Sequence, residues 1–89
     1  MTRRDVLIRN RLGLHARAAA RFVQLASRFR SRITLTRDSR TMDGKSILGI
    51  LLLAAARGST LVVAAEGADE ADAVEALAAL VESGFGEEA

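Results

Sequence analysis

The chain has 89 residues, of which 49% are hydrophobic and 27% are charged. A chain of this length forms one core, which excludes a multidomain enzyme, so we expect a single domain over 1–89, with its core at about 4–84 and a short acidic tail at 85–89. The absence of cysteine excludes disulfides and thiolate metal sites. Neither the ten-residue apolar run at 47–56 nor the N-terminus resembles a membrane span or signal peptide, so we expect a cytoplasmic protein without membrane insertion.

The net charge of +2 conceals a segregation along the chain. All 13 basic residues lie in positions 1–57 with only three acids, which gives that part a charge of +10. Positions 58–89 hold the other eight acids and no base, which gives −8. Such a division indicates a basic face directed at an anionic partner, without saying which anion.

The first half of the chain predicts a strand, a helix and a strand pair. Residues 6–8 are a short apolar run between charged flanks, which indicates a strand. From Ala16 onward, apolar residues recur at helical spacing with arginines on the other side, which predicts an amphipathic helix. Residues 33–36 alternate in polarity as a half-buried strand does, and residues 41–42 are placed to pair back as the second arm of a hairpin.

The second half predicts two helices around a buried strand. Ser46 is a favoured helix N-cap before the apolar run 47–56, and Gly58 is a suitable stop for that helix. Residues 61–65 are continuously apolar, which is typical of a central strand.

The last segment opens with acids at positions 69, 70 and 72, which complement the dipole of a final helix that ends at Gly84. The resulting order βαββαβα predicts an α+β fold, a small antiparallel or mixed sheet with helices on one face.

His15 is the only histidine, and it stands where the first strand passes into the first helix. No Ser, Thr, Asp or Asn occupies the cap position, so we expect the backbone amides of Ala16, Arg17 and Ala18 to form an anion site before the imidazole. Arg17 adds a guanidinium fork that suits phosphate oxygens. An unprotonated imidazole nitrogen in this setting can accept a phosphoryl group. The alternative is that His15 itself caps the helix and Arg17 is a solvated base.

Two separated motifs carry a resemblance to a known family. The stretch GLHARAAA at 13–20, followed by DGKSILGILLLAAARGS at 43–59, resembles the HPr family of histidine-containing phosphocarrier proteins of the phosphoenolpyruvate-dependent phosphotransferase system. The resemblance covers about residues 4–84. It implies an HPr-like open-faced βαββαβα sandwich, with a small antiparallel sheet and three helices on one face.

The resemblance also implies a function. His15 would accept a phosphoryl group through Nδ1 from phosphorylated enzyme I and pass it to an enzyme IIA protein or domain, in sugar uptake or in nitrogen-branch regulation. Arg17 matches the arginine that neutralises the phosphoryl charge. The protein would be a phosphoryl carrier and not an enzyme, without cofactor or metal. One departure from the family is Ala18, which stands where many members have proline. The absence of this proline removes no phosphate ligand.

Two further roles follow for the second helix. Ser46 matches the serine that an HPr kinase/phosphorylase modifies in some bacterial groups, and it remains a helix cap in either case. A helix that is apolar nearly all round cannot bury every side chain in so small a domain, so part of it is expected to form an exposed patch. The resemblance assigns partner docking to this patch. The expected contacts are Ile47, Leu48 and Leu51, with Arg17, Arg21 and Lys45 at the rim.

Two other functions remain open at this point. The basic charge of positions 1–57 also suits a nucleic-acid-binding module, although the chain has no Trp or Tyr and only three Phe to stack on bases. A ligand-binding regulatory domain of similar composition is the third alternative, without any pocket signature. For the phosphocarrier we expect a monomer that binds neither nucleic acid nor membrane.

Overall fold

Residues 1–87 are described in a computed structural model. The elements are β1 (Thr2–Leu7), α1 (Ala16–Ala26), β2 (Arg32–Arg37), β3 (Arg40–Asp43), α2 (Ile47–Leu52), β4 (Thr60–Glu66) and α3 (Glu70–Glu82), followed by a 3₁₀ turn at Gly84–Gly86. This order is the predicted βαββαβα order. No helix within residues 1–87 is long and apolar enough to cross a membrane.

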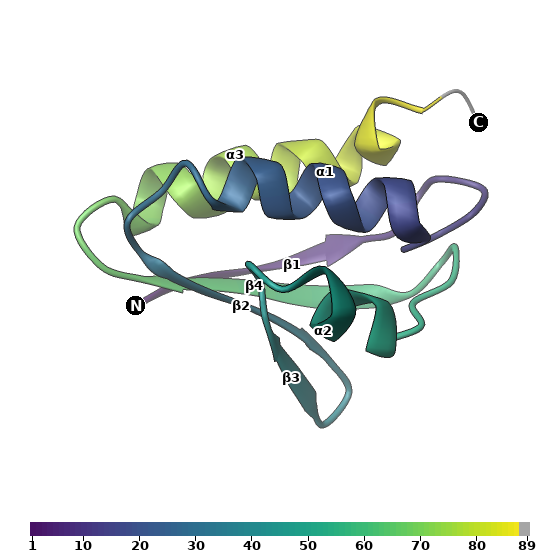
Figure 1. Cartoon of the computed structure of the whole chain (residues 1–89), viewed down its shortest axis with the longest axis horizontal. Coiled ribbons are helices and arrows are strands. Elements are labelled where there is room, and N and C mark those ends of the chain that lie inside the picture. Colours follow the sequence, from purple (N-terminus) through teal and green to yellow (C-terminus); the bar gives the residue numbers. More distant parts are fainter. Residues whose placement is uncertain (88–89) are drawn as a thin grey trace.

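The four strands form one antiparallel sheet in the order β1-β4-β2-β3, which confirms the predicted sheet and makes β4 a central strand. Leu61 pairs with Val6 on β1, and Val63 pairs with Leu35 on β2, so apolar residues face each other across the ladder. The three helices leave the other face of the sheet open (Figure 1). The α+β open-faced sandwich is therefore confirmed.

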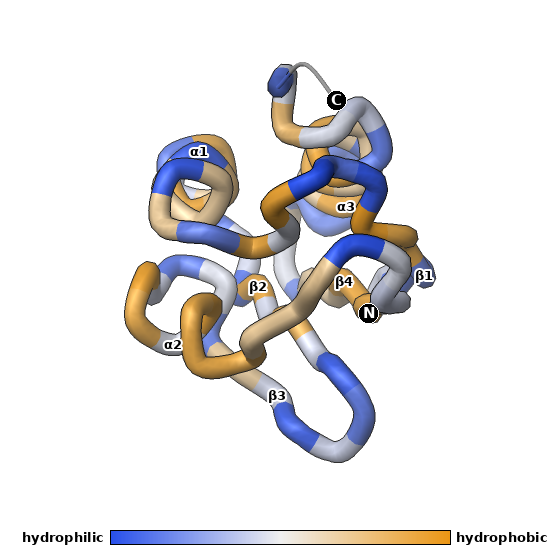
Figure 2. Tube along the Cα trace, turned by 90° about the vertical axis from the view of Figure 1, so that its right-hand side faces the viewer, coloured by the Kyte–Doolittle hydropathy of each residue, from blue (hydrophilic) through white to orange (hydrophobic). Residues whose placement is uncertain are grey.

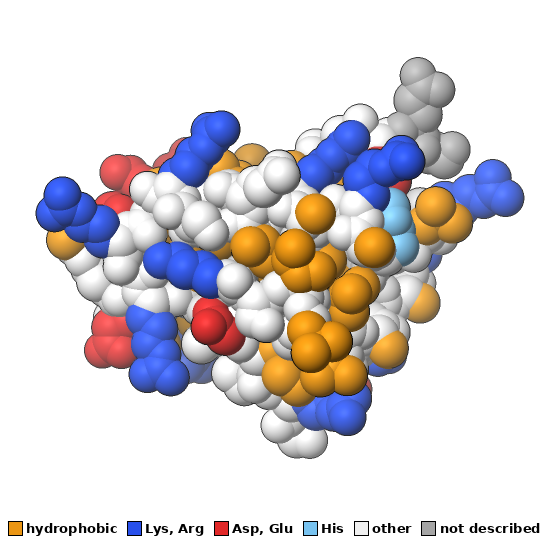
Figure 3. Space-filling view, viewed as in Figure 1, with side chains coloured by type: hydrophobic (Ala, Val, Ile, Leu, Met, Phe, Trp, Pro, Cys, Tyr) orange, Lys and Arg blue, Asp and Glu red, His pale blue; other side chains and the backbone are white. Residues whose placement is uncertain are grey.

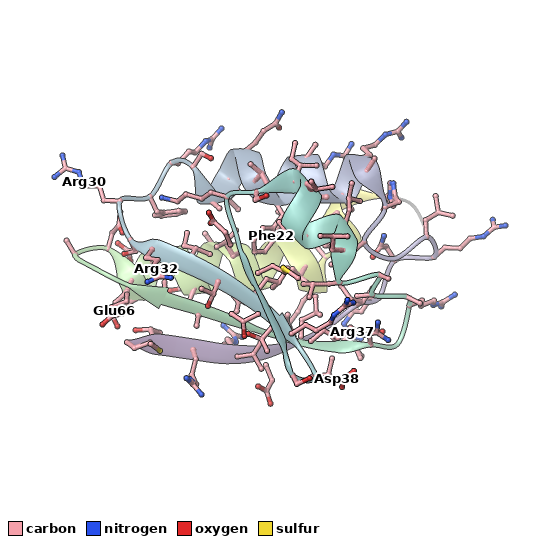
Figure 4. All side chains as sticks on the ribbon, turned by 60° about the horizontal axis from the view of Figure 1, so that its bottom comes forward. Phe22, Arg30, Arg32, Arg37, Asp38 and Glu66 are labelled. Carbon is pink, nitrogen blue, oxygen red and sulfur yellow. The ribbon has the colours of Figure 1, made fainter. Side chains whose placement is uncertain are left out.

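α1 and α3 lie side by side over the covered face of the sheet, as the two views agree (Figures 1 and 2). Phe22 is fully buried between α1 and the sheet (Figure 4). Small residues on both helices, such as Ala19 and Ala78, are also fully buried and let the helix backbones approach closely. This packing holds α1, which begins directly after His15, against the sheet and α3.

The predicted helix over 47–56 is too long, because α2 ends at Leu52. Two arginines of the β2–β3 hairpin donate hydrogen bonds to the carbonyls at the C-terminal end of α2. Nη1 of Arg37 donates to the carbonyl of Leu53 at 2.9 Å, and Nη1 of Arg40 donates to that of Leu52 at 3.0 Å. Arg37 lies at the turn end of the hairpin, next to Asp38 (Figure 4). The backbone leaves the helix at Ala54, whose φ is +49°, and the two arginines satisfy carbonyls that the helix leaves free there. α2 therefore ends six residues before Gly58.

One of the acids predicted to complement the dipole of α3 also makes specific contacts elsewhere. Asp69 precedes the helix and makes no side-chain cap bond to it. Its carboxylate instead accepts the backbone N–H of Arg30 at 2.8 Å and of Ser31 at 2.9 Å, as well as the Ser31 hydroxyl. At the other end, Phe85 belongs to the buried core although the sequence analysis assigned it to the tail.

Candidate functional site

A tight loop carries His15 to the start of α1. The N–H of Leu14 donates to the carbonyl of Ala55 at 2.9 Å, which joins this loop to the segment after α2. Gly13 has a φ of +66°, and a Cβ there would lie 2.5 Å from the Ala55 oxygen. Only glycine permits this approach. The backbone entering α1 is therefore fixed by contacts with a second segment.

His15 occupies the N-cap position of α1 in extended conformation, and its side chain makes no capping hydrogen bond. Its carbonyl accepts the N–H of Ala19 at 2.9 Å, which is the first helical bond. The amides of Ala16, Arg17 and Ala18 consequently have no partner within the helix. Of the alternative interpretation, a capping bond from the imidazole is absent, because the side chain turns to another partner.

That partner is Glu87, which sequence reasoning left without a position. Its Oε2 lies 2.8 Å from Nε2 of His15, and its Oε1 accepts Nδ2 of Asn10 at 2.7 Å. Both side chains of the pair are largely covered, with 25% of His15 and 14% of Glu87 exposed. The hydrogen bond from His15 holds the pKa of Glu87 below its usual range; burial opposes this, and the bond from Asn10 assists it.

An ionised carboxylate only accepts hydrogen bonds, so Nε2 of His15 must carry the hydrogen. Nδ1 makes no hydrogen bond to any of residues 1–87. In the neutral ring the lone pair therefore resides on Nδ1. The geometry supplies one free nucleophilic nitrogen beside an uncapped helix start.

The two arginines predicted at this site differ in their environment. Arg17 is exposed and makes no ion pair or side-chain hydrogen bond within the described part of the chain, so its guanidinium is free to meet an anion. Arg21 is half-buried, and its Nη1 donates to the carbonyl of Phe85. Arg21 therefore holds the segment after α3 in place. The sequence predicted only that Arg21 lies at the rim of the docking patch.

Lys45 is also engaged. Its Nζ donates to the carbonyl of Phe29 at 2.7 Å, just beyond the C-terminal end of α1. His15 is at the opposite end of this 11-residue helix, which spans about 16 Å. Lys45 is thus brought to the far end of α1 and not beside the imidazole.

An exposed apolar patch lies next to His15 (Figure 3). Three exposed large apolar side chains, Ile47, Leu48 and Leu52, belong to α2, and a fourth, Leu12, belongs to the loop that carries His15. Leu48 is 68% exposed, as expected for a contact residue, whereas Leu51 is half-buried against the core, which corrects its predicted exposure. Leu12, at 66%, was missed because an isolated apolar residue in a turn has no helical or strand periodicity.

Ser46 caps α2 as predicted. Its Oγ accepts the N–H of Gly49 at 3.1 Å, and its side chain is half-buried. Ile47 and Leu48 of the apolar patch follow directly in the helix. A charge added at Ser46 would therefore adjoin the patch.

A comparison with known protein families identifies the family of this chain. A family model described as "PTS HPr component phosphorylation site" matches residues 2–83. The chain belongs to the HPr family. HPr proteins are phosphocarriers of the phosphotransferase system, which agrees with the function implied by the sequence motifs.

Individual HPr relatives agree along the whole chain. The phosphocarrier protein HPr of Cupriavidus necator is 48% identical over 87 residues, covering 98% of each chain. The crystal structure of HPr-C-His from Thermoanaerobacter tengcongensis covers 100% of both chains with 46% identity and a TM-score of 0.96. Bacillus subtilis Crh, described as a swapped dimer, is 42% identical with a TM-score of 0.77, over 94% of this chain and 97% of Crh.

Proposed function

We propose that His15 accepts a phosphoryl group on Nδ1 from phosphorylated enzyme I and passes it to an enzyme IIA. The observation that carries this proposal is the pairing of Nε2 with Glu87, which leaves the Nδ1 lone pair free. Nδ1 belongs to the residue at the N-cap of α1, whose first amides lack helical partners.

The transfer step needs positioning and charge stabilisation more than a deep pocket. The Nδ1 lone pair attacks phosphorus in line with the bond to the donor residue of enzyme I, so the N–P bond forms as that bond breaks and its electrons return to the donor. The amides of Ala16, Arg17 and Ala18 and the exposed Arg17 guanidinium face the phosphoryl oxygens. Passing the group to enzyme IIA is the same step in reverse, with His15 as the leaving group.

The apolar patch of Leu12, Ile47, Leu48 and Leu52 is the surface on which both partners dock. A patch beside the phosphoryl site brings the donor or acceptor residue of the partner to Nδ1. Arg17 contributes positive charge at this end of α1, which speeds encounters with acidic partners. The carrier acts as a monomer in this account, whereas a swapped dimer has been described for Crh.

Ser46 is a candidate regulatory site for an HPr kinase/phosphorylase. A phosphate on Ser46 would be favourable for the α2 N-terminus but would add negative charge beside Ile47 and Leu48. Docking of an acidic partner on that patch would weaken.

Purified enzyme I and phosphoenolpyruvate test the proposal. The wild-type chain is expected to gain one phosphoryl group, measured as a mass increase that acid treatment removes, and His15→Ala is expected to gain none. Labelling of His15→Ala to the wild-type extent would show that another residue is the acceptor.

A further inference from the structure

The segment after α3 is fastened to the site at several points. The side chain of Phe85 is buried in the core at 1% exposure, and its carbonyl accepts a hydrogen bond from Arg21. Two residues later, Glu87 accepts hydrogen bonds from Asn10 and His15. The Glu87 carboxylate is therefore held against the imidazole by the anchored backbone at Phe85 and by the side chain of Asn10.

Asn10 joins this carboxylate to the loop that carries His15. Nδ2 of Asn10 donates one hydrogen to the carbonyl of Gly13 at 2.8 Å and the other to Oε1 of Glu87 at 2.7 Å. Both partners are pure acceptors, so the amide cannot be turned to place its oxygen there. Asn10 is 3% exposed, and its Oδ1 has no hydrogen-bond partner within the described residues. A buried polar atom left unsatisfied is costly, and a specific task for the amide explains it.

We propose that Asn10 and Glu87 are positioning residues for His15, which hold its neutral ring in the tautomer with hydrogen on Nε2 and so direct phosphorylation to Nδ1. This inference rests on the proposed function and names two residues that act at the same site. Neither residue was among the sites predicted from the sequence. The chain of contacts runs from Asn10 to Glu87 to the ring, and only the ring reacts.

The same carboxylate serves the phosphorylated state. When the N–P bond forms at Nδ1, the hydrogen stays on Nε2 and the ring becomes positively charged. Glu87 then faces a cation, and the pair stabilises the phosphorylated ring electrostatically. When the phosphoryl group leaves, the bonding electrons return to Nδ1 and the ring is neutral again without any proton transfer. Arg21 is the other charged group facing Glu87, and it helps to keep the carboxylate ionised.

Three variants separate the parts of this inference. Glu87→Ala removes the acceptor, Glu87→Gln keeps an acceptor oxygen without the charge, and Asn10→Ala frees the carboxylate from its other partner. Glu75→Gln is the matched control, because Glu75 is exposed on α3 and has no side-chain partner among residues 1–87. Amide NMR spectra establish that each variant is folded.

The first readout is the pair of ¹⁵N chemical shifts of the His15 ring at a pH where the ring is neutral. The wild type and Glu75→Gln are expected to show hydrogen on Nε2 alone. Glu87→Ala and Asn10→Ala are expected to show a mixture of both tautomers, and Glu87→Gln to keep the Nε2–H form.

The second readout is the rate of phosphorylation by enzyme I. We expect Glu87→Ala to be about tenfold slower, as when carboxylates that orient other imidazoles are removed. Glu87→Gln is expected to lie between Glu87→Ala and the wild type. If wild-type protein accepts no phosphoryl group, the proposed function fails. If it does accept one while Glu87→Ala keeps the wild-type shifts and an equal or faster rate, the positioning role is overturned. If Asn10→Ala keeps the wild-type ¹⁵N shifts and the wild-type phosphorylation rate while Glu87→Ala does not, the role assigned to Asn10 is overturned.

Discussion

The carboxylate of Asp69 accepts the Ser31 N–H at 2.9 Å and also the Ser31 hydroxyl, although the two residues are 38 positions apart in the chain. This contact joins the start of α3 to the turn that leads into β2. The Ser31 hydroxyl, followed by the Arg30 N–H, lowers the pKa of Asp69 to about 2. The ionised form of Asp69 is therefore the form that stabilises the fold.

The contact predicts how stability changes in acid. A group whose folded pKa lies below its ordinary value of 3.8 contributes stability that is complete above that value and is lost as the pH falls toward 2. Asp69→Asn should lower the urea midpoint of unfolding at pH 7, and its difference from wild type should shrink between pH 4 and pH 2. Asp72→Asn, in the first turn of the same helix, loses only an interaction with the helix dipole and should lower the midpoint less than Asp69→Asn does. A constant difference at all pH values would mean that the charge of Asp69 is not what matters.

The apolar patch predicts a loss of docking without a loss of stability. Leu12→Ala and Leu48→Ala remove side chains that are mostly exposed, so the free energy of unfolding should change by less than about 0.5 kcal/mol. Each should weaken the affinity for enzyme I by about fivefold or more, since truncating a central interface residue costs about 1 kcal/mol or more. Titration calorimetry with enzyme I measures the effect.

Leu7→Ala is the matched control for the patch. Leu7 is also partly exposed, but it alternates along the chain with the buried Val6 and Ile8, which places it on the sheet face that the helices leave open. Its affinity for enzyme I should equal that of the wild type. Equal losses at Leu7 and Leu48 would contradict a localised docking surface.

Arg17 predicts a defect in the transfer step. In the proposed transfer its free guanidinium neutralises charge on the phosphoryl group, and removal of one such donor typically slows a reaction by about a hundredfold. Arg17→Gln should therefore reduce the single-turnover rate of phosphorylation at saturating enzyme I. Arg28→Gln removes an equally exposed charge just beyond the other end of α1 and should leave that rate unchanged. A similar loss in both variants would indicate general steering by net charge.

Ser46 predicts that capping and docking can be separated. Ser46→Ala loses the bond to the Gly49 N–H and should cost about 1 kcal/mol of stability while the transfer rate holds. Ser46→Asp keeps a capping oxygen, so its stability should be near wild type, but the added charge should weaken binding to enzyme I. Urea unfolding measures the stability of each variant, and stopped-flow phosphorylation at increasing enzyme I concentration measures its transfer rate and its binding to enzyme I. Unchanged binding in Ser46→Asp would contradict regulation through this charge.

Local patterns in the sequence predicted most of the architecture. The continuous apolar run at 61–65 identified β4 as a central strand, and Ser46 marked the start of α2. The predicted end of α2 was wrong because the backbone turns at Ala54, whose φ is +49°, while Arg37 and Arg40 of the preceding hairpin donate to the free carbonyls there. Propensity favoured a longer helix, and this turn overrode it.

Local sequence patterns also predicted part of the candidate site, namely the residues that lie at the start of α1. His15 and Arg17 are two positions apart at one helix start, so their proximity could be predicted without knowledge of the fold. Glu87 lies 72 positions from His15, and nothing local to either residue announces their contact. Asp69 suited the helix dipole by position, yet its carboxylate is used by Ser31 and the preceding amide. Long-range hydrogen bonds account for each of these differences.

The central claim is that Nδ1 of His15 is the atom that carries the phosphoryl group. The most direct measurement labels the imidazole nitrogens with ¹⁵N, phosphorylates the protein with enzyme I and phosphoenolpyruvate, and identifies the nitrogen bonded to phosphorus by NMR. We predict one N–P linkage, at Nδ1, with hydrogen retained on Nε2. A linkage at Nε2, or phosphorus on any residue other than His15, would contradict the account.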